Sequence, residues 1–226
     1  SEVMDTNTRA VEFVSNIRDL HETHSLPILI NGLVGPAGDA YAPDRPLDAG
    51  DAFLIHSPQI QYLRRAGVDM VSAMTLTHVS EAIGIVRAAQ EVDVPVVIAF
   101  TLETDGRLPS GQSLGEAIEE VDAATGNGPI YYIINCAHPD HFKDRLDTNA
   151  AWMLRVGGIR SNASRLSHAE LDECEELDDG DPVELGKLNA ELLTLLPSIR
   201  VVGGCCGTDH RHVGCIAGHR LKRSAA

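Results

Sequence analysis

Gly203-Gly204-Cys205-Cys206-Gly207-Thr208 follows directly on the apolar run Ile199-Arg200-Val201-Val202 near the C-terminal end of the chain. The run predicts a buried strand, and the glycines after it predict a tight turn. A further cysteine, Cys136, follows a second apolar run, Ile130-Tyr131-Tyr132-Ile133-Ile134, in the same way. Because ligands bind at the carboxyl ends of parallel strands, we expect the three thiols to meet at one edge of a sheet. Three protein ligands with a fourth position open are typical of a catalytic zinc site.

The same cysteines have other interpretations. Free cysteine is among the most buried residue types, so the three could be small hydrophobic side chains. Cys136 could also form a disulfide with one of the two adjacent cysteines, whereas a bridge between neighbours would be strained. The glycines at positions 203, 204 and 207 favour the metal site, because they let the backbone turn tightly and let a metal or substrate approach closely.

Apolar runs alternate with segments of helical periodicity along the chain. The helix expected at 52–66 contains Pro58, which must kink it or mark its start. The helix expected at 182–196 has Asp181 as its cap and Pro182 at its first position. Strands are expected at 27–30, 68–74, 95–100, 130–134, 156–159 and 199–202, and the other helices at 10–20, 80–90, 114–124, 141–146 and from about 208.

This alternation predicts an α/β fold with a parallel sheet. A doubly wound sheet and part of an eight-fold barrel both fit, and both bind ligands at the carboxyl edge. A strand order that reverses midway would indicate the doubly wound sheet, whereas a sequential order would indicate the barrel. No linker or low-complexity segment divides the chain, so we expect a single domain over residues 1–226.

The cysteine motif also carries a resemblance to a known family. The motif 203–208, read with Asn135-Cys136, resembles the zinc site of the homocysteine S-methyltransferase family, which includes betaine- and S-methylmethionine-dependent enzymes and the homocysteine domain of cobalamin-dependent methionine synthase. Residues 31–36 resemble the family's loop at strand three. Residues 100–111, with Phe100-Thr101 and two later glycines, resemble the loop after strand five.

The resemblance favours the barrel over the doubly wound sheet. We therefore expect a (β/α)8 TIM barrel whose first strand–helix units are missing from this chain. The chain begins in what looks like the helix after strand two, and the family's first strand, with its Asp-Gly-Gly turn, has no counterpart. Six strand–helix units cannot close an eight-stranded barrel. We therefore expect either residues that precede Ser1 or a broken barrel.

The resemblance implies zinc-dependent transfer of a methyl group to a small thiol such as homocysteine, giving methionine, with Cys136, Cys205 and Cys206 as the metal ligands. A thiol that coordinates zinc is deprotonated, so this reaction needs no acid–base residue of the protein. A zinc hydrolase or lyase on the same scaffold, and a zinc-binding barrel without catalysis, are the alternatives. The partners expected are the thiol and a methyl donor.

Substrate contacts are expected after other strands. The family places a glutamate after strand four to hold the amino group of homocysteine, and the matching position here is Met74. The thiol therefore differs from homocysteine, or its amine is held elsewhere. Asn135, Asn162 and Thr75 are candidates for polar contacts to the substrate, and Thr101 is a weaker candidate of the same kind.

Composition limits the classes of protein. The formal net charge of −15 disfavours nucleic acid and anionic membranes as partners. No stretch approaches the about 18 apolar residues that span a bilayer, and no signal segment opens the chain. Five cysteines without framework spacing argue for a reducing compartment, so we expect a cytoplasmic protein and leave homo-oligomers open.

Four further residues lie outside the expected ligand set. His210 and His212 stand close to the cysteine pair and could donate hydrogen bonds to the metal ligands, but we expect them to face solvent. Cys174 and Cys215 lie on helix- or loop-like segments, away from strand ends, and are not expected to be ligands.

Overall fold

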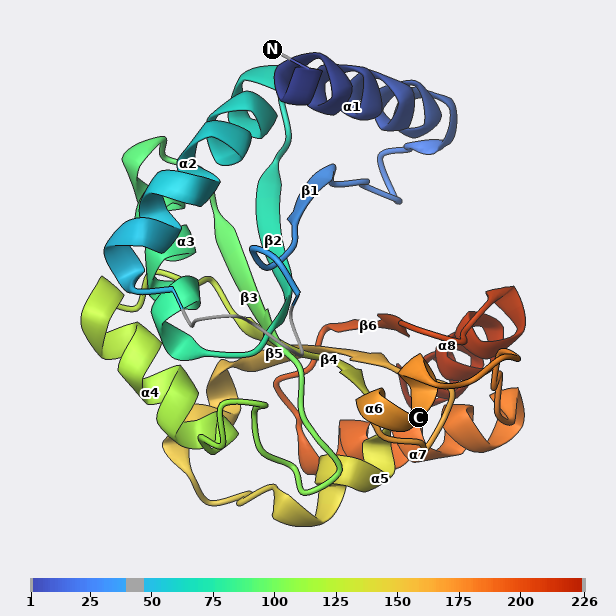
Figure 1. Cartoon of the computed structure of the whole chain (residues 1–226). Coiled ribbons are helices and arrows are strands. Elements are labelled where there is room, and N and C mark those ends of the chain that lie inside the picture. The colour runs from blue at the N-terminus through green and yellow to red at the C-terminus, as the bar shows by residue number, and fades with distance from the viewer. Residues whose placement is uncertain (1, 40–46, 225–226) are drawn as a thin grey trace. The chain divides into compact units, whose positions relative to one another are not determined.

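The structure is a computed structural model that describes residues 2–39 and 47–224. Its sheet has six strands in sequential order, labelled β1 to β6 in Figure 1. They are β1 Asn31–Val34, β2 Met70–Leu76, β3 Val96–Phe100, β4 Tyr132–Ala137, β5 Val156–Ser161 and β6 Val201–Gly204. β1 pairs in parallel with β2, and β5 pairs in parallel with both β4 and β6. The order excludes the doubly wound sheet and confirms the barrel-type α/β fold.

The chain divides into two compact units. The first contains residues 1–98 and 120–130, and the second contains residues 99–119 and 131–226. Because the boundaries pass through β3 and α4 (Leu114–Thr125), each unit is described by itself. The expectation of a single domain stays a prediction.

Two helices of the first unit pack closely against each other. α2 (Ala49–Ala66) and α3 (Val79–Glu91) meet at Gly84. A Cβ atom added there would lie 2.5 Å from the Ala52 Cβ and 2.7 Å from the Ala49 carbonyl oxygen. Only a residue without a side chain fits this approach of two helix backbones.

A buried carboxylate holds the start of α3 to two other segments of the first unit. Glu81 is 2% exposed, and its Oε1 accepts hydrogen bonds from His56 Nε2 at 2.8 Å and from the Ala37 N–H at 2.7 Å. His78 caps the helix by accepting from the Glu81 N–H, and burial lowers the pKa of this imidazole. A carboxylate this deeply buried requires hydrogen-bond partners, so the stability of the fold is sufficient to explain why these residues lie together.

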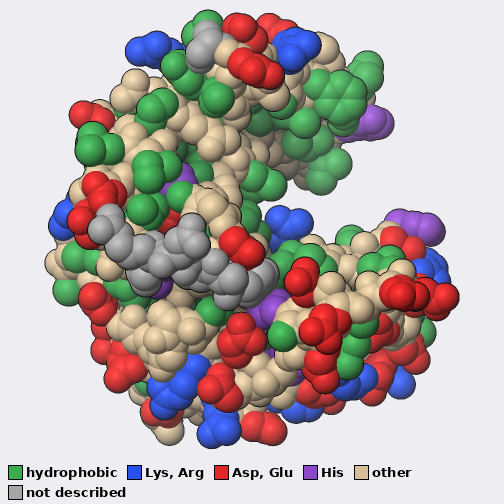
Figure 2. All heavy atoms as spheres, viewed as in Figure 1, with side chains coloured by type: hydrophobic (Ala, Val, Ile, Leu, Met, Phe, Trp, Pro, Cys, Tyr) green, Lys and Arg blue, Asp and Glu red, His purple; other side chains and the backbone are tan. Residues whose placement is uncertain are grey.

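The first helix, α1 (Glu2–His21), is only weakly buried within its unit. Val11 is its one buried residue among those described, whereas Phe13 is 65% exposed and Leu20 is 80% exposed. Figure 2 shows hydrophobic side chains gathered over the end of α1 on the face in view.

The second unit is built around β4 and β5. Its core includes the fully buried ring of Tyr132, which stacks on Phe100 with ring centroids 6.2 Å apart. Beyond the strands and the start of α4, its elements are α5 Pro139–Phe142, η1 Lys143–Arg145, η2 Ala151–Arg155, α6 His168–Asp172, α7 Pro182–Leu195 and α8 His210–Ser224.

The first expected strand, at 27–30, is wrong. The ladder begins at Asn31, which is in register with Met70, and runs to Val34. The N–H of Ile28 donates a hydrogen bond to the Glu22 carboxylate, and the N–H of Ile30 donates one to the Asp69 carboxylate. Because side chains satisfy these donors, the apolar run itself does not pair as a strand.

Most helices and the other strands lie within a few residues of their expected positions. α2 begins at Ala49 with Asp48 as its N-cap, so Pro58 lies inside the helix and does not mark its start. The short α6 was not expected, although Ser167 and Glu170 form a capping box at its start. None of the described helices is long and apolar enough to cross a membrane.

The expected cap of α7 is confirmed and gives a first prediction. The Asp181 carboxylate accepts hydrogen bonds from the N–H groups of Val183 and Glu184, at 2.8 and 3.2 Å. Asp181→Ala is expected to lower the free energy of unfolding by about 1 kcal/mol, because two helix N–H groups lose their acceptor. Urea titration followed by circular dichroism measures this. Asp181→Asn, which keeps a capping oxygen, should retain most of the stability, and equal losses in both variants would contradict the capping role.

Candidate metal centre

Three cysteine sulfur atoms converge in the second unit. Cys136 Sγ lies 2.8 Å from Cys205 Sγ and 3.5 Å from Cys206 Sγ. All three sulfur atoms lie within 4.8 Å of one another, and they are the one such group of potential ligands among the described residues. Each of the five cysteines is free. The expected convergence of the three thiols is confirmed, although the Cys136–Cys205 separation is shorter than the about 3.5–4 Å expected between two sulfur ligands of one tetrahedral zinc ion.

The position of Cys136 depends on an irregular backbone in β4. Its φ of +52° lies in the left-handed region, which is unusual for a residue other than glycine. The β4–β5 register shifts there, because Asn135 pairs with Arg160 while Ala137 pairs with Ser161. Cys136 is thus the extra residue of a bulge, and bulges of this kind re-aim a side chain beside functional sites.

Two side chains hold the carbonyl group of this bulge. His168 Nε2 donates to the Cys136 carbonyl oxygen at 2.7 Å, and Thr101 Oγ1 donates to the same oxygen at 3.2 Å. The other ring nitrogen of His168 lies 3.2 Å from a Glu103 carboxylate oxygen, which orients the ring. The left-handed backbone conformation of Cys136 has a cost in free energy, and two hydrogen bonds to its carbonyl oxygen help to offset that cost.

The loop after β6 is tied to β5 at Cys205. The Cys205 N–H donates to the Ser161 carbonyl at 2.8 Å, and its own carbonyl accepts from Thr208 Oγ1 at 2.7 Å. A Cβ at Gly204 would run into the side chain of Thr208. The glycine before the cysteine pair is therefore needed for this turn.

The second cysteine of the pair is fixed by the segment after β5. The Cys206 N–H donates to Asn162 Oδ1 at 3.1 Å, and the Ala163 N–H donates to the Cys206 carbonyl at 3.0 Å. Gly207 then takes a φ of +75°, and a Cβ there would lie 2.7 Å from the Asp178 carbonyl oxygen. These contacts leave Cys206 exposed while Cys136 is buried, so the sulfur group is open on one side.

Electrostatics make the three sulfur atoms unequal. Hydrogen bonds from Cys136 and Cys206 lower the pKa of the Cys205 thiol, and the Arg160 guanidinium lowers it further. The pKa of Cys136 is raised, first by its hydrogen bond to Cys205 and then by burial. Asn135 Nδ2 donates a long hydrogen bond of 4.0 Å to the Cys205 sulfur atom. The arrangement stabilises negative charge on the Cys205 sulfur atom, and a set of three cysteine sulfur atoms is chemically suited to a soft divalent metal.

The other expected site residues fall into two groups. Asn135 and Asn162 both adjoin the sulfur group, where they contact Cys205 and the N–H of Cys206. Met74 and Thr75 lie in β2, in the first unit, and Thr75 has a left-handed φ of +61°. Substrate contact by these four residues stays a prediction.

One expectation about the histidines is wrong. His212 is fully buried: its Nε2 lies 2.7 Å from the Asp179 carbonyl oxygen, and its Nδ1 accepts from the Asp209 N–H at 3.1 Å. The ring thus holds the loop that contains Asp179 against α8, which sequence spacing does not reveal. His210 is exposed as expected, and Cys174 and Cys215 lie outside the sulfur group.

Sequence reasoning missed His168 and Arg160. Both lie close to the sulfur group in space, but neither stands in a motif with a cysteine. The capping box around Ser167 could have located α6 and thereby His168. A separate open cavity of about 440 Å³ in the same unit, lined by residues that include Glu119, Arg145 and Trp152, contains none of the expected site residues.

Comparisons with known proteins agree with this geometry. A sequence model of the family described as Homocysteine S-methyltransferase matches residues 1–219. Homocysteine S-methyltransferase 1 of Arabidopsis thaliana is 25% identical over 173 residues, which cover 74% of this chain and 51% of the relative. The chain therefore spans about half the length of that relative.

Solved structures with the same fold include those of the homocysteine methyltransferase MmuM from Escherichia coli, at 18% identity. The TM-score is 0.72 for its apo and metallated forms and 0.70 for its oxidised form. The matches cover 95–96% of this chain and 70–74% of the MmuM chains.

Proposed function

The chain belongs to the homocysteine S-methyltransferase family, and on that premise we propose that it binds zinc through Cys136, Cys205 and Cys206 and transfers a methyl group from a small donor to a thiol. Homocysteine is the first candidate for that thiol, with methionine as the product. The observation that carries the proposal is the convergence of three thiols, one of them exposed, at the ends of β4 and β6.

The three residues fit the metal. Ligand sulfur atoms that lie about 2.3 Å from a tetrahedral zinc ion are about 3.8 Å apart, and the three sulfur atoms here already lie within 4.8 Å of one another. Zinc held by these three thiolates would keep one ligand position for a substrate thiol, and the exposure of Cys206 leaves the sulfur group accessible to one. Bound zinc would keep a thiol substrate in its deprotonated, nucleophilic form at neutral pH.

The chain's own residues contribute by holding the ligands in place. The bulge at Cys136, the Asn162 contact to Cys206 and the turn at Gly207 fix three sulfur positions before any metal binds. A preorganised ligand set gains affinity because little conformational freedom is lost on binding. No general base is required for a thiolate to attack a methyl group, which is consistent with a site made of sulfur and amide groups.

The test is methyl transfer by the full-length protein loaded with zinc. Homocysteine is offered with S-methylmethionine, betaine or methylcobalamin, and the methyl thioether is measured by mass spectrometry. The expected result is methionine formation that depends on zinc. If zinc binds stoichiometrically but no thiol is methylated and none perturbs the spectrum of the cobalt-substituted protein, the proposal is wrong.

A positioning role for His168 gives a further prediction. His168→Ala removes the stronger of the two donors to the Cys136 carbonyl, so the bulge loses support and zinc affinity should fall by about 10–100-fold. Competition with a chromophoric chelator measures the affinity. His141→Ala is a matched control, because its Nε2 contacts the Arg165 carbonyl instead, and it should leave zinc affinity unchanged. Equal effects of both substitutions would contradict the role of His168.

A further inference from the structure

One arginine of the second unit lies in the same row of the sheet as two residues of the candidate site. Arg160 on β5 is in register with Asn135 on β4 and with Gly203 on β6. A Cβ at Gly203 would lie 3.7 Å from Arg160 Cγ, so the arginine stem extends over the glycine. Arg160 Nε donates to the Gly204 carbonyl oxygen at 3.2 Å, which holds the guanidinium beside the cysteine loop.

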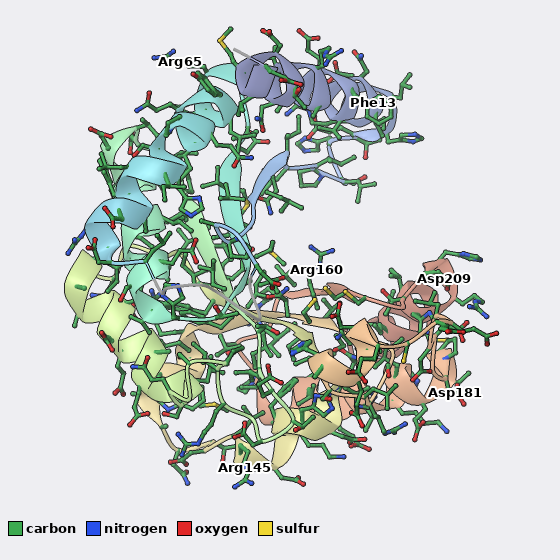
Figure 3. The ribbon with its side chains drawn as sticks, viewed as in Figure 1. Phe13, Arg65, Arg145, Arg160, Asp181 and Asp209 are labelled. Atoms are coloured by element: carbon green, nitrogen blue, oxygen red, sulfur yellow. The ribbon has the colours of Figure 1, made fainter. Side chains whose placement is uncertain are left out.

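The position of this guanidinium brings it close to the sulfur atoms. Figure 3 shows Arg160 extending from β5 beside the end of β6. Its charge acts on Cys205, which follows directly on the carbonyl that it binds. The guanidinium therefore lies within electrostatic range of the sulfur group.

The guanidinium is also unusual in having no carboxylate. Arg165 of the same unit pairs with Asp140 and with Glu184. Arg160 has no ion pair among the described residues, although the chain carries a net charge of −15. Of its donors, only Nε has a hydrogen-bond partner within the part of the chain that the structure describes. The terminal nitrogens therefore present a fork of donors of the kind that binds a carboxylate in a bidentate manner.

We propose that Arg160 binds the carboxylate of the thiol substrate, so that the site selects small thiols that carry a carboxylate. The inference rests on the proposed function and adds to it the residue that sets the preference for a carboxylate. Three thiolates and zinc carry a formal charge of −1, so an anionic thiol is repelled unless a cation lies nearby. Arg160 supplies that cation and the geometry that orients the ligand, whereas Met74 offers no charge to an amine.

A purely electrostatic role is the competing interpretation. Arg160 could serve only to stabilise negative charge on Cys205, and any cation would then suffice. Lysine keeps the charge but lacks the planar fork, so Arg160→Lys separates the two roles. If the guanidinium binds the carboxylate through two nitrogens, the lysine variant should lose part of the selectivity for thiols with a carboxylate. If only the charge matters, the lysine variant should lose none of it.

The test measures thiol binding rather than turnover. Cobalt-substituted full-length protein is titrated with 3-mercaptopropionate, 2-mercaptoethanol and cysteamine, and Kd is taken from the visible absorption of the cobalt ion. In the unmodified protein the carboxylate thiol should bind about 10-fold or more tightly than the neutral one, and cysteamine should bind no better than the neutral one.

Arg160→Met should reduce this preference to less than about 2-fold while cobalt stays bound, and Arg160→Lys should give an intermediate value. Arg145→Met is the control, because Arg145 lies on η1 and is exposed, and its substitution removes one positive charge from the same unit. This variant should keep the preference for the carboxylate thiol. If Arg160→Met does not bind cobalt, the lysine variant decides alone.

The failures are distinguishable. Thiols that bind without carboxylate preference, or a preference that survives both Arg160 substitutions, overturn the role of Arg160 and leave methyl transfer standing. A cobalt spectrum that no thiol changes overturns the proposed function and the role of Arg160 with it.

Discussion

Cys206→Ala is expected to abolish stoichiometric zinc binding while the protein stays folded. The substitution leaves two thiolates at the candidate centre, and a zinc site with only two protein ligands is weaker by orders of magnitude. The fold should persist because Cys206 is exposed and its backbone contacts to Asn162 and Ala163 do not involve the side chain. Zinc per chain is measured by elemental analysis after reconstitution and gel filtration under reducing conditions.

The chain offers a matched control for this substitution. Cys174 is also exposed and free, but it lies outside the sulfur group. Cys174→Ala should therefore bind one zinc ion per chain, like the unmodified protein. Stoichiometric zinc in the Cys206→Ala variant would remove Cys206 from the ligand set, and circular dichroism would show whether lost binding reflects lost structure.

Gly84→Ala is expected to destabilise the protein, although glycine to alanine inside a helix normally stabilises. Helix propensity alone favours alanine by about 1 kcal/mol. At Gly84, however, the new methyl group meets the Ala52 Cβ and the backbone of Ala49 at 2.5 and 2.7 Å, so α2 and α3 must move apart. Overpacking of this kind costs about 1–3 kcal/mol, which reverses the sign.

Gly214→Ala is the control for the propensity term. Gly214 is an exposed position of α8, and nothing lies within 4 Å of an added Cβ. Alanine there should raise the free energy of unfolding by up to about 1 kcal/mol. Thermal unfolding of the two variants should shift in opposite directions, by about 2–4 °C per kcal/mol for a chain of this size. A stabilised Gly84→Ala variant would show that the close approach of the two helices is wrong.

The cysteine site shows how far local patterns in the sequence reach. Cys136 and the pair Cys205-Cys206 each follow an apolar run, and parallel strands in sequential order bring such positions to one edge of the sheet. The convergence of the three thiols could be predicted because a strand and the residue that follows it are both recognised in a short segment. The rule that ligands bind at the carboxyl ends of parallel strands then places these residues together. The same holds for the Asp181 cap, whose acceptors and donors are at most three residues apart.

Register and long-range contacts could not be read in this way. The first strand begins at Asn31 and not in the apolar run before it, because the partner Met70 and the side chains of Glu22 and Asp69 decide which N–H groups enter the ladder. A hydrophobic run specifies burial but does not specify its pairing partner.

The sequence by itself determined that this chain is an α/β protein of alternating strands and helices with three cysteines at strand ends, because periodicity and turn residues act locally. Only the tertiary structure decided that Cys136 lies in a bulge, that His168 holds its carbonyl and that Arg160 lies over Gly203. Each of these depends on residues at least 24 positions apart in sequence, such as Ala137 and Ser161 at the bulge, meeting in the folded unit. Such contacts form only when the whole unit packs, so no short segment encodes them.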